Sequence, residues 1–273
     1  MDRLGRSYTF PSTQVRQTKA PKSRLQGVTE IRGPYYSVMG PTYLEDILEA
    51  QGQFIDGLKF AGGSLSLMPR ERIKLITALA HRHGIYVNTG GWADQMLAKG
   101  PRFFDRYVTE CKDLGFDVVE LSNEFLKFRE DDLMRLIRTV RNAGLKAKPE
   151  ILFEVGRGTT NEHSDREEYD DLELLMKRAE RCLEAGAYMI LIESDGLTRN
   201  VPAWRTDVLA EIVGRLGLER TMFEAHEPNV FEWFIKNYGS KVNLYVNHSD
   251  SGHLERLRSG APQGDWIQSS FSI

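Results

Sequence analysis

Residues 54–89 read FIDGLKFAGGSLSLMPRERIKLITALAHRHGIYVNT and hold one complete strand–helix–strand unit. The apolar run 54–60 predicts a strand, the amphipathic stretch 69–83 predicts a helix, and 85–89 predicts the next strand. Pro69 stands where a first helical turn tolerates proline, and Gly84 stands just past the helix end, where glycine favours the left-handed cap conformation. Such a unit is typical of a parallel sheet whose helices lie outside it.

The same alternation recurs along the chain. Strands are predicted at 35–39, 54–60, 85–89, 118–122, 147–155, 188–193, 221–225 and 242–248. Helices are predicted at 42–52, 69–83, 92–114, 129–143, 170–186, 202–217, 228–238 and 251–259. Eight such units within residues 29–273 favour a single closed (β/α)8 TIM barrel of the α/β class, and a doubly wound open sheet is the alternative.

Composition excludes several other classes of protein. The chain has 273 residues with 36 Lys+Arg against 39 Asp+Glu, so its net charge of −3 gives no electrostatic case for nucleic acid as the partner. A hydrophobic content of 41% and a charged content of 27% are those of a globular protein. No apolar run approaches the ~20 residues of a transmembrane helix, so we expect no membrane partner.

The N-terminal segment 1–28 differs from the rest, because it contains one acid, Asp2, together with Pro11, Pro21 and six basic residues: Arg3, Arg6, Arg16, Lys19, Lys22 and Arg24. We expect a disordered or extended tail, followed by the barrel domain at 29–273. An organelle transit peptide is the alternative, which the two prolines weaken, and an apolar signal-peptide core is absent.

The two cysteines, Cys111 and Cys182, fall in helix-like stretches with apolar neighbours. They are expected to be reduced core residues of a cytoplasmic protein. The sequence carries none of the CxxC, HExxH, GxGxxG or P-loop signatures, so those zinc, dinucleotide and nucleotide sites are not expected. The oligomeric state stays open, with a homo-oligomer among the alternatives.

Each of four successive predicted strands carries a glutamate at or near its carboxyl end. In a barrel of this kind the chemistry gathers at the carboxyl ends of the strands. A ring of Glu120, Glu154, Glu193 and Glu224 would repel itself without a cation, and hard oxygen ligands on separate strands suit Mg²⁺. The sequence therefore predicts a Mg²⁺ site formed by at least two of them, and salt-bridged or outward-facing glutamates are the alternative.

Groups that would bind an anion stand at the same strand ends. Lys59 interrupts an apolar strand, so its charge must reach water, a carboxylate or a ligand. Backbone N–H groups of two glycine pairs could meet phosphate oxygens. The residues expected to bind substrate or phosphate are Gly62, Gly63, Ser64, Gly90, Gly91, Arg157, His226 and Asn247.

Five segments at these strand ends resemble the phosphosulfolactate synthase family: GLKFAGG at 57–63, VNTGGW at 87–92, LGFDVVELS at 114–122, FEVG at 153–156 and MFEA at 222–225. The resemblance covers about residues 29–260. RAERCLEAG at 178–186 and GRLGLE at 214–219 are more similar to the branch that includes the plant heat-stress-associated proteins. The resemblance implies a (β/α)8 barrel that adds sulfite to phosphoenolpyruvate with Mg²⁺, forming phosphosulfolactate for coenzyme M synthesis.

The resemblance also implies roles for individual residues. Lys59, Glu154 and Arg157 are expected to be catalytic, with Lys59 and Mg²⁺ stabilising the charge on the substrate carboxylate. One position departs from the family, because Arg157 follows Glu154-Val155-Gly156 where the archaeal enzymes have lysines. Arginine binds anions but is a poor proton donor. A barrel that has lost catalysis and serves heat-stress tolerance or protein interaction is therefore the alternative to a lyase.

Overall fold

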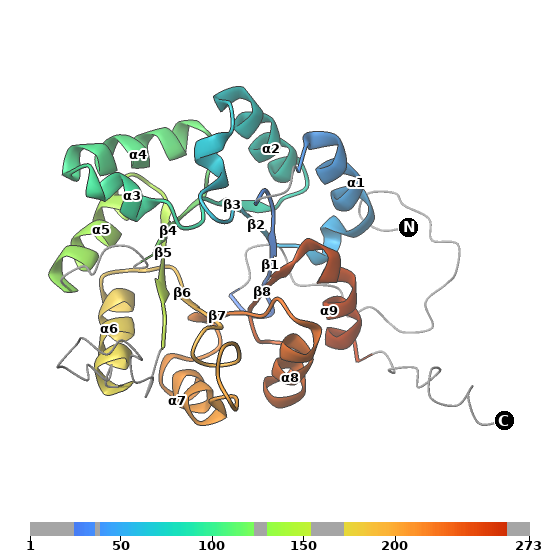
Figure 1. Cartoon of the computed structure of the whole chain (residues 1–273). Helices are drawn as coiled ribbons and strands as arrows, with labels where there is room; N and C mark the ends of the chain where they lie inside the picture. The colour runs from blue at the N-terminus through green and yellow to red at the C-terminus, as the bar shows by residue number, and fades with distance from the viewer. Residues whose placement is uncertain (1–24, 36–38, 123–129, 154–171, 261–273) are drawn as a thin grey trace.

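The protein, seen in a computed structural model, is described over residues 25–35, 39–122, 130–153 and 172–260 (Figure 1). Eight parallel strands pair in chain order, and β1 also pairs with β8, which closes the barrel and excludes an open sheet. The predicted (β/α)8 barrel is confirmed. The strands are β1 (Thr29–Arg32), β2 (Gly57–Lys59), β3 (Tyr86–Asn88), β4 (Val118–Leu121), β5 (Lys146–Ile151), β6 (Ile190–Ile192), β7 (Thr221–Glu224) and β8 (Leu244–Asn247).

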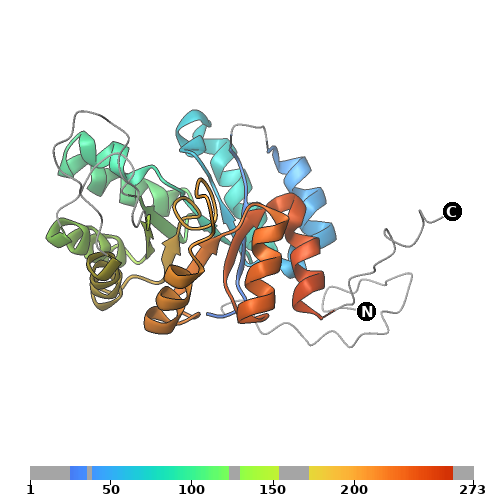
Figure 2. The ribbon, with the colours of Figure 1, turned by 60° about the horizontal axis from the view of Figure 1, so that its bottom comes forward.

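Helices surround the strands, and in both ribbon views α1 and α9 lie side by side where the first and last units meet (Figures 1 and 2). The Ser251 hydroxyl of α9 donates to Gln51 of α1 across this seam. The helices are α1 (Pro41–Gln51), α2 (Arg70–Arg82), α3 (Ala93–Ala98), α4 (Pro101–Asp113), α5 (Glu130–Asn142), α6 (Leu172–Glu184), α7 (Thr206–Leu216), α8 (Pro228–Tyr238) and α9 (Ser251–Arg258). Short 3-10 turns are η1 (Gly52–Phe54), η2 (Ser64–Leu67) and η3 (His248–Asp250).

The predicted helix 92–114 is two helices instead of one. Gly100, at φ +112°, stands between α3 and α4, and Pro101 is the first residue of α4. Proline cannot donate the backbone hydrogen bond that a continuous helix needs there, so the chain starts a new helix at Pro101.

The first predicted strand, 35–39, is wrong. The strand at this place is β1, six residues earlier at Thr29–Arg32, while residues 36–38 lie outside the described part of the chain. The error has a physical cause. Glu30 and Arg32 occupy alternate positions of β1 and point into a charged barrel interior, so an apolar pattern does not mark this strand. The other seven strands lie within their predicted ranges, except that β5 begins one residue early and ends at Ile151.

Most of the apolar core lies between the strands and the helices. The outward side chains of the strands, among them Ile31, Leu58, Val119 and Phe223, pack against the helices in one continuous cluster. Both cysteines, Cys111 and Cys182, are free and buried in this cluster, as predicted. The second apolar cluster of the described residues is small and consists of Val28, Met189, Leu191, Met222 and Tyr245.

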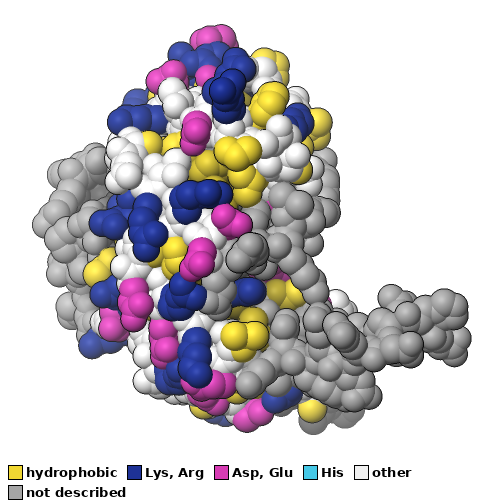
Figure 3. All heavy atoms as spheres, turned by 90° about the vertical axis from the view of Figure 1, so that its left-hand side faces the viewer, with side chains coloured by type: hydrophobic (Ala, Val, Ile, Leu, Met, Phe, Trp, Pro, Cys, Tyr) yellow, Lys and Arg dark blue, Asp and Glu magenta, His cyan; other side chains and the backbone are white. Residues whose placement is uncertain are grey.

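Many charged side chains lie on the outer surface of the helices. Figure 3 shows acidic and basic side chains interspersed over the face that bears α4 to α6. Several form ion pairs, such as Arg181 with Asp131 at 3.0 Å and Arg215 with Glu173 at 2.6 Å. Exposed pairs of this kind contribute little stability, about 0–1 kcal/mol each. No helix in the described part of the chain has the length and apolar character that a membrane crossing requires.

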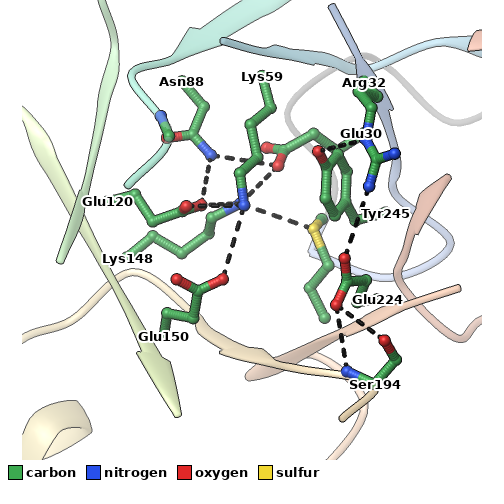
Figure 4. Close-up of polar contacts among 12 residues, drawn as sticks. Glu30, Arg32, Lys59, Asn88, Glu120, Lys148, Glu150, Ser194, Glu224 and Tyr245 are labelled. Carbon is green, nitrogen blue, oxygen red and sulfur yellow. Dashed lines mark hydrogen bonds and ion pairs between the residues drawn. The ribbon is translucent and has the colours of Figure 1, made fainter. Parts of the chain in front are cut away.

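The middle of the barrel holds an ion network where barrels of this class usually hold branched apolar residues (Figure 4). Lys148 Nζ of β5 lies 2.6 Å from Glu30 Oε1 of β1 and 3.5 Å from Glu120 Oε2 of β4. The Asn88 amide of β3 donates to both glutamates, at 3.2 and 3.0 Å. Because all four side chains are buried, each charge depends on its partners for solvation.

One glycine at the barrel mouth has no room for a side chain. Gly90 has φ +66°, and a Cβ placed on it would come 1.9 Å from the Phe60 carbonyl oxygen. The left-handed backbone alone costs an L-residue about 1–2 kcal/mol, and the contact adds to that cost. We therefore expect Gly90→Ala to lower the urea midpoint of unfolding clearly. Gly40→Ala, where a Cβ meets nothing within 4 Å, is the matched control, and equal midpoints for both variants would contradict this account.

The central ion pair gives a second stability prediction. Lys148→Met leaves Glu30 and Glu120 with one cation fewer in a buried site, which costs about 3–5 kcal/mol in comparable cases. The double variant Glu30→Gln/Lys148→Met removes both members of the 2.6 Å pair, and we expect it to regain at least half of the lost unfolding free energy. Denaturant unfolding of the two single variants and the double variant measures this coupling. Additive losses would argue against it.

Candidate active site

The carboxyl ends of the strands direct a group of polar side chains into the barrel mouth (Figure 4). Each stands at an inward-facing position, because side chains alternate between the two faces of a strand. The group consists of Arg32 (β1), Lys59 (β2), Glu120 (β4), Glu150 (β5), Glu224 (β7) and Tyr245 (β8). Five of these six side chains are acidic or basic, and each lies near an opposite charge on a strand that is not its direct neighbour in the barrel.

Lys59 is the centre of this group. Its Nζ lies 2.7 Å from Glu120 Oε1, 3.7 Å from Glu150 Oε1 and 4.4 Å from the centre of the Tyr245 ring. Burial by itself would lower the pKa of Lys59, but Glu120 and Glu150 outweigh it and raise the pKa well above the ordinary value. Lys59 is therefore an ammonium ion, and its partner is a carboxylate, one of the partners expected for a lysine within an apolar strand.

Glu120 is the buried counterion of that ammonium. Burial would raise its pKa, but Lys59 and Lys148 lower the pKa below the usual value, so the carboxyl is ionised. Its backbone N–H donates to Thr89 Oγ1 at 3.1 Å, which ties β4 to the end of β3. Glu120 is thus anchored between two lysines at the floor of the mouth.

Glu150 differs from Glu120 in its surroundings. Its side chain is 13% exposed, against 1% for Glu120, and its nearest cation is Lys59 at 3.7 Å. Burial raises the pKa of Glu150, the charge of Lys59 offsets part of this rise, and Glu120 and Glu224 raise the pKa further, to about 7. Near neutral pH this carboxyl is therefore divided between its protonated and ionised forms.

Glu224 is ionised and held from several sides. Its Oε2 accepts from the Ser194 backbone N–H at 3.2 Å and the Ser194 hydroxyl at 3.0 Å, while His226 Nε2 lies 2.5 Å from Oε1. Burial would raise the pKa of Glu224, but His226, Lys59 and the Ser194 N–H hold it well below its usual range. The His226 ring meets Tyr245 edge-on, with ring centres 4.6 Å apart.

Arg32 is a second cation at the mouth. Its Nη2 lies 3.7 Å from Glu224 Oε1, its Nε donates to the Tyr245 hydroxyl at 3.4 Å, and its guanidinium stands 4.9 Å from the Tyr35 ring centre. These contacts are long, and a quarter of the side chain is exposed. Arg32 can therefore offer N–H donors to an anion that enters the mouth.

A pocket adjoins Glu224 on the side of β6 and α8. The loop after β6 that forms part of its wall is held by an ion pair between Arg199 and Asp195 at 2.7 Å. The pocket brings one cation, two carboxylates and a histidine together with smaller side chains. Its lining residues are Ser194, Thr198, Arg199, Glu224, His226, Glu227 and Val230.

Several sequence-predicted site residues converge at the mouth, namely Lys59, Glu120, Glu224 and His226. Glu193 follows β6 directly and is partly buried. Two further predicted residues, Glu154 and Arg157, lie outside the described residues, as do 1–24 of the predicted tail.

Other predicted ligand-binding residues already bond to the protein. The Ser64 hydroxyl donates to the Pro34 carbonyl at 2.8 Å, and the Gly90 N–H donates to Asn88 Oδ1 at 3.2 Å. The Asn247 amide donates to the His226 carbonyl at 2.8 Å. Gly62 and Gly63 form a left-handed turn, at φ +56° and +67°. Gly91 faces one of the acids, as a Cβ there would lie 3.9 Å from Glu150 Oε2.

Six members of the site and its supporting network were not predicted from the sequence. They are Glu30, Arg32, Asn88, Lys148, Glu150 and Tyr245. A usable signal was present, because Glu30 and Arg32, and likewise Lys148 and Glu150, stand two residues apart on strands. Charged side chains at period two share one face of a strand, which here is the barrel interior.

The described residues fit Mg²⁺ in one mode of binding only. No group of three or more His, Cys, Asp or Glu side chains within them is arranged as a metal cage. Lys59 and Lys148 lie against the two oxygens of Glu120. Mg²⁺ often binds through one or two carboxylates, with waters and substrate phosphates completing its shell. Glu193 and Glu224, at adjacent strand ends, suit that mode.

Known proteins are similar to this chain over most of its length. The family described as (2R)-phospho-3-sulfolactate synthase (ComA) matches residues 17–263. The Arabidopsis thaliana protein HEAT-STRESS-ASSOCIATED 32 is 45% identical over 263 residues, with 92% of each chain covered. Phosphosulfolactate synthase of Methanothermobacter thermautotrophicus is 26% identical over 256 residues, which cover 91% of this chain and 94% of that one.

Among solved structures, 3-hexulose-6-phosphate synthase from Salmonella typhimurium has the same fold, with a TM-score of 0.54 at 15% identity over 85% of this chain and 97% of that one. That likeness concerns the barrel alone. The sequence match spans almost the whole chain and includes the strand ends that carry Lys59, Glu120 and Glu224. The chain therefore belongs to the phosphosulfolactate synthase family.

Proposed function

We propose that this protein is a phosphosulfolactate synthase-like lyase, which adds sulfite to phosphoenolpyruvate or a similar nucleophile to a related small phosphorylated carboxylate. The single observation that carries the proposal is the buried ammonium of Lys59 at the floor of the mouth, 2.7 Å from its counterion Glu120, in a chain of this family. A fixed cation in a water-poor site is suited to stabilise negative charge that develops during a reaction.

The residues present account for the main step. Sulfite sulfur forms a bond to the terminal carbon of the substrate double bond, the double bond breaks, and its electron pair moves toward the adjacent carbon and the carboxylate. Lys59 carries three N–H donors, so it can retain Glu120 and still direct a donor at that carboxylate. Arg32, at the rim, would hold a second anionic group of the substrate. A general acid then protonates the carbon next to the carboxylate.

Mg²⁺ and two residues outside the described ranges would complete the site. Mg²⁺ bound by Glu193 and Glu224 would neutralise charge on the substrate carboxylate and phosphate. Glu154 and Arg157 would complete the site, with Arg157 as an anion-binding group, because a guanidinium stays protonated at ordinary pH. The product would be phosphosulfolactate, after which the archaeal relatives, the phosphosulfolactate synthases, are named.

A specific observation favours a second candidate function. The relative at 45% identity is named for heat stress, so a barrel that serves stress tolerance or protein interaction without catalysis is the alternative. The two candidates differ in what they require of Lys59. Catalysis needs its ammonium at the mouth, whereas an interaction role needs only the folded barrel.

The activity prediction rests on that difference. We expect sulfite-dependent consumption of phosphoenolpyruvate by the wild type, measured by ³¹P NMR. Lys59→Met should lower kcat by about 10²–10³-fold, the cost of removing one donor that stabilises developing charge. Lys99→Met, a change of an exposed lysine, is the matched control. A folded wild type without turnover would favour the stress-tolerance alternative.

Metal binding gives a separate prediction. Mg²⁺ should raise the melting temperature of the wild type, because a ligand at 100 times its Kd adds about 2.7 kcal/mol to the stability of the state that binds it. Glu224→Gln should reduce this shift, whereas Glu180→Gln, on the outer face of α6, should keep it. Thermal melts with and without Mg²⁺ decide the matter. Equal melting temperatures for the wild type in both conditions would remove Mg²⁺ from the proposal.

A further inference from the structure

The charges around Lys59 do not pair evenly. Four carboxylates, of Glu30, Glu120, Glu150 and Glu224, face three fixed cations. Lys148 lies 2.6 Å from Glu30, and Lys59 lies 2.7 Å from Glu120. Glu224 contacts both Arg32 and His226. Glu150 lies 3.7 Å from Lys59, which is already paired with Glu120. Among the four carboxylates, this is the longest distance to the nearest basic group.

Glu150 is also placed where a bound molecule can reach it. It stands near the carboxyl end of β5 and its side chain is 13% exposed, whereas Glu30 and Glu120 are 0–1% exposed. Gly91, which follows β3, presents backbone without a side chain to Glu150, since a Cβ there would lie 3.9 Å from Glu150 Oε2. A substrate carboxylate on Lys59 would therefore lie next to the Glu150 carboxyl.

We propose that Glu150 is a catalytic residue, namely the acid that delivers a proton to the substrate carbon adjacent to the carboxylate. This inference rests on the proposed function and supplies the general acid that the function requires. Neither Lys59 nor Glu224 suits that role: the first is a fixed ammonium and the second a fixed carboxylate.

Proton delivery by Glu150 completes the addition. When the sulfur–carbon bond forms, the electron pair of the broken double bond moves to the adjacent carbon and the carboxylate. The Glu150 O–H bond then breaks, its proton forms the new C–H bond, and Glu150 is left as a carboxylate beside Lys59. The proton that bisulfite releases when it reacts as sulfite returns to Glu150 through water. The net change is the addition of hydrogen and a sulfonate group across the double bond.

The groups that face Glu150 set its protonation. Burial raises its pKa, Lys59 of β2 opposes the rise, and Glu120 of β4 and Glu224 of β7 add to it, so the pKa is about 7. Lys148, on the same strand, is engaged with Glu30 and Glu120. A general acid is most effective when its pKa lies near the working pH, which Glu150 satisfies.

Kinetics of three proteins test the assignment: wild type, Glu150→Gln and Glu150→Asp. For the wild type, kcat should fall as pH rises through about 7, because the acid must be protonated. Glu150→Gln should lose about 10²–10⁴-fold in kcat, keep its KM for phosphoenolpyruvate within about threefold and lose that pH limb. Glu150→Asp should recover part of kcat together with the limb.

Stability provides a readout that needs no turnover. With a folded pKa of about 7 against 4.5 when unfolded, Glu150 retains its proton on folding, so its contribution is present below pH 4.5 and is lost as pH rises through 7. The melting temperature of Glu150→Gln relative to wild type should therefore increase from pH 5 to pH 8. Melts of Glu150→Asp, which keeps the carboxyl, should follow the wild type.

The outcomes separate the two levels of the proposal. A wild type that adds sulfite, with Glu150→Gln keeping its kcat and pH limb, overturns the role of Glu150 and leaves the proposed function standing. A wild type that adds no sulfite overturns both. A melting difference that stays constant from pH 5 to pH 8 overturns the role of Glu150 whatever the activity, because the carboxyl then holds no proton to give.

Discussion

A charge inside a closed barrel has lost its water and must be matched by protein groups, because an unpaired buried ion costs several kcal/mol. Here Lys59 and Lys148 enter the interior from β2 and β5, and Glu30, Glu120 and Asn88 meet them there. The contacts join strands β1, β2, β3, β4 and β5, so the register of more than half of the barrel depends on them. The apolar contacts that stabilise the fold are correspondingly concentrated between the strands and the helices.

This arrangement links the interior to the mouth. Lys148 occupies Glu30 and part of Glu120, which leaves Lys59 to a single close carboxylate. The lysine that reaches the mouth is therefore oriented by buried groups deeper in the barrel. Preorganised charge of this kind stabilises developing negative charge without rearrangement at the moment of reaction. The same network makes Glu150 the carboxyl that holds a proton most firmly, because its pKa is raised while the pKa values of Glu120 and Glu224 are lowered.

The barrel itself says little about chemistry. Solved structures with TM-scores near 0.54 and 15% identity share the fold, and one fold hosts many reactions. The family match adds the strand ends, since it spans residues 17–263 and so includes each inward-facing residue of the mouth that the structure describes. The proposed chemistry accordingly depends on Lys59, Arg32 and the acids around them, and on their distances, more than on the architecture.

The sequence determined the alternation of strands and helices, because apolar periodicity, Pro69 and Gly84 act over a few residues. It also determined the importance of Lys59, Glu120 and Glu224, since a charge at the end of an apolar strand needs a partner. Only the tertiary structure decided that β1 is Thr29–Arg32 and that Glu150 lies beside Lys59. Barrel closure brings Glu30 within reach of Lys148, 118 residues away, and such pairing across strands leaves no local mark in the sequence.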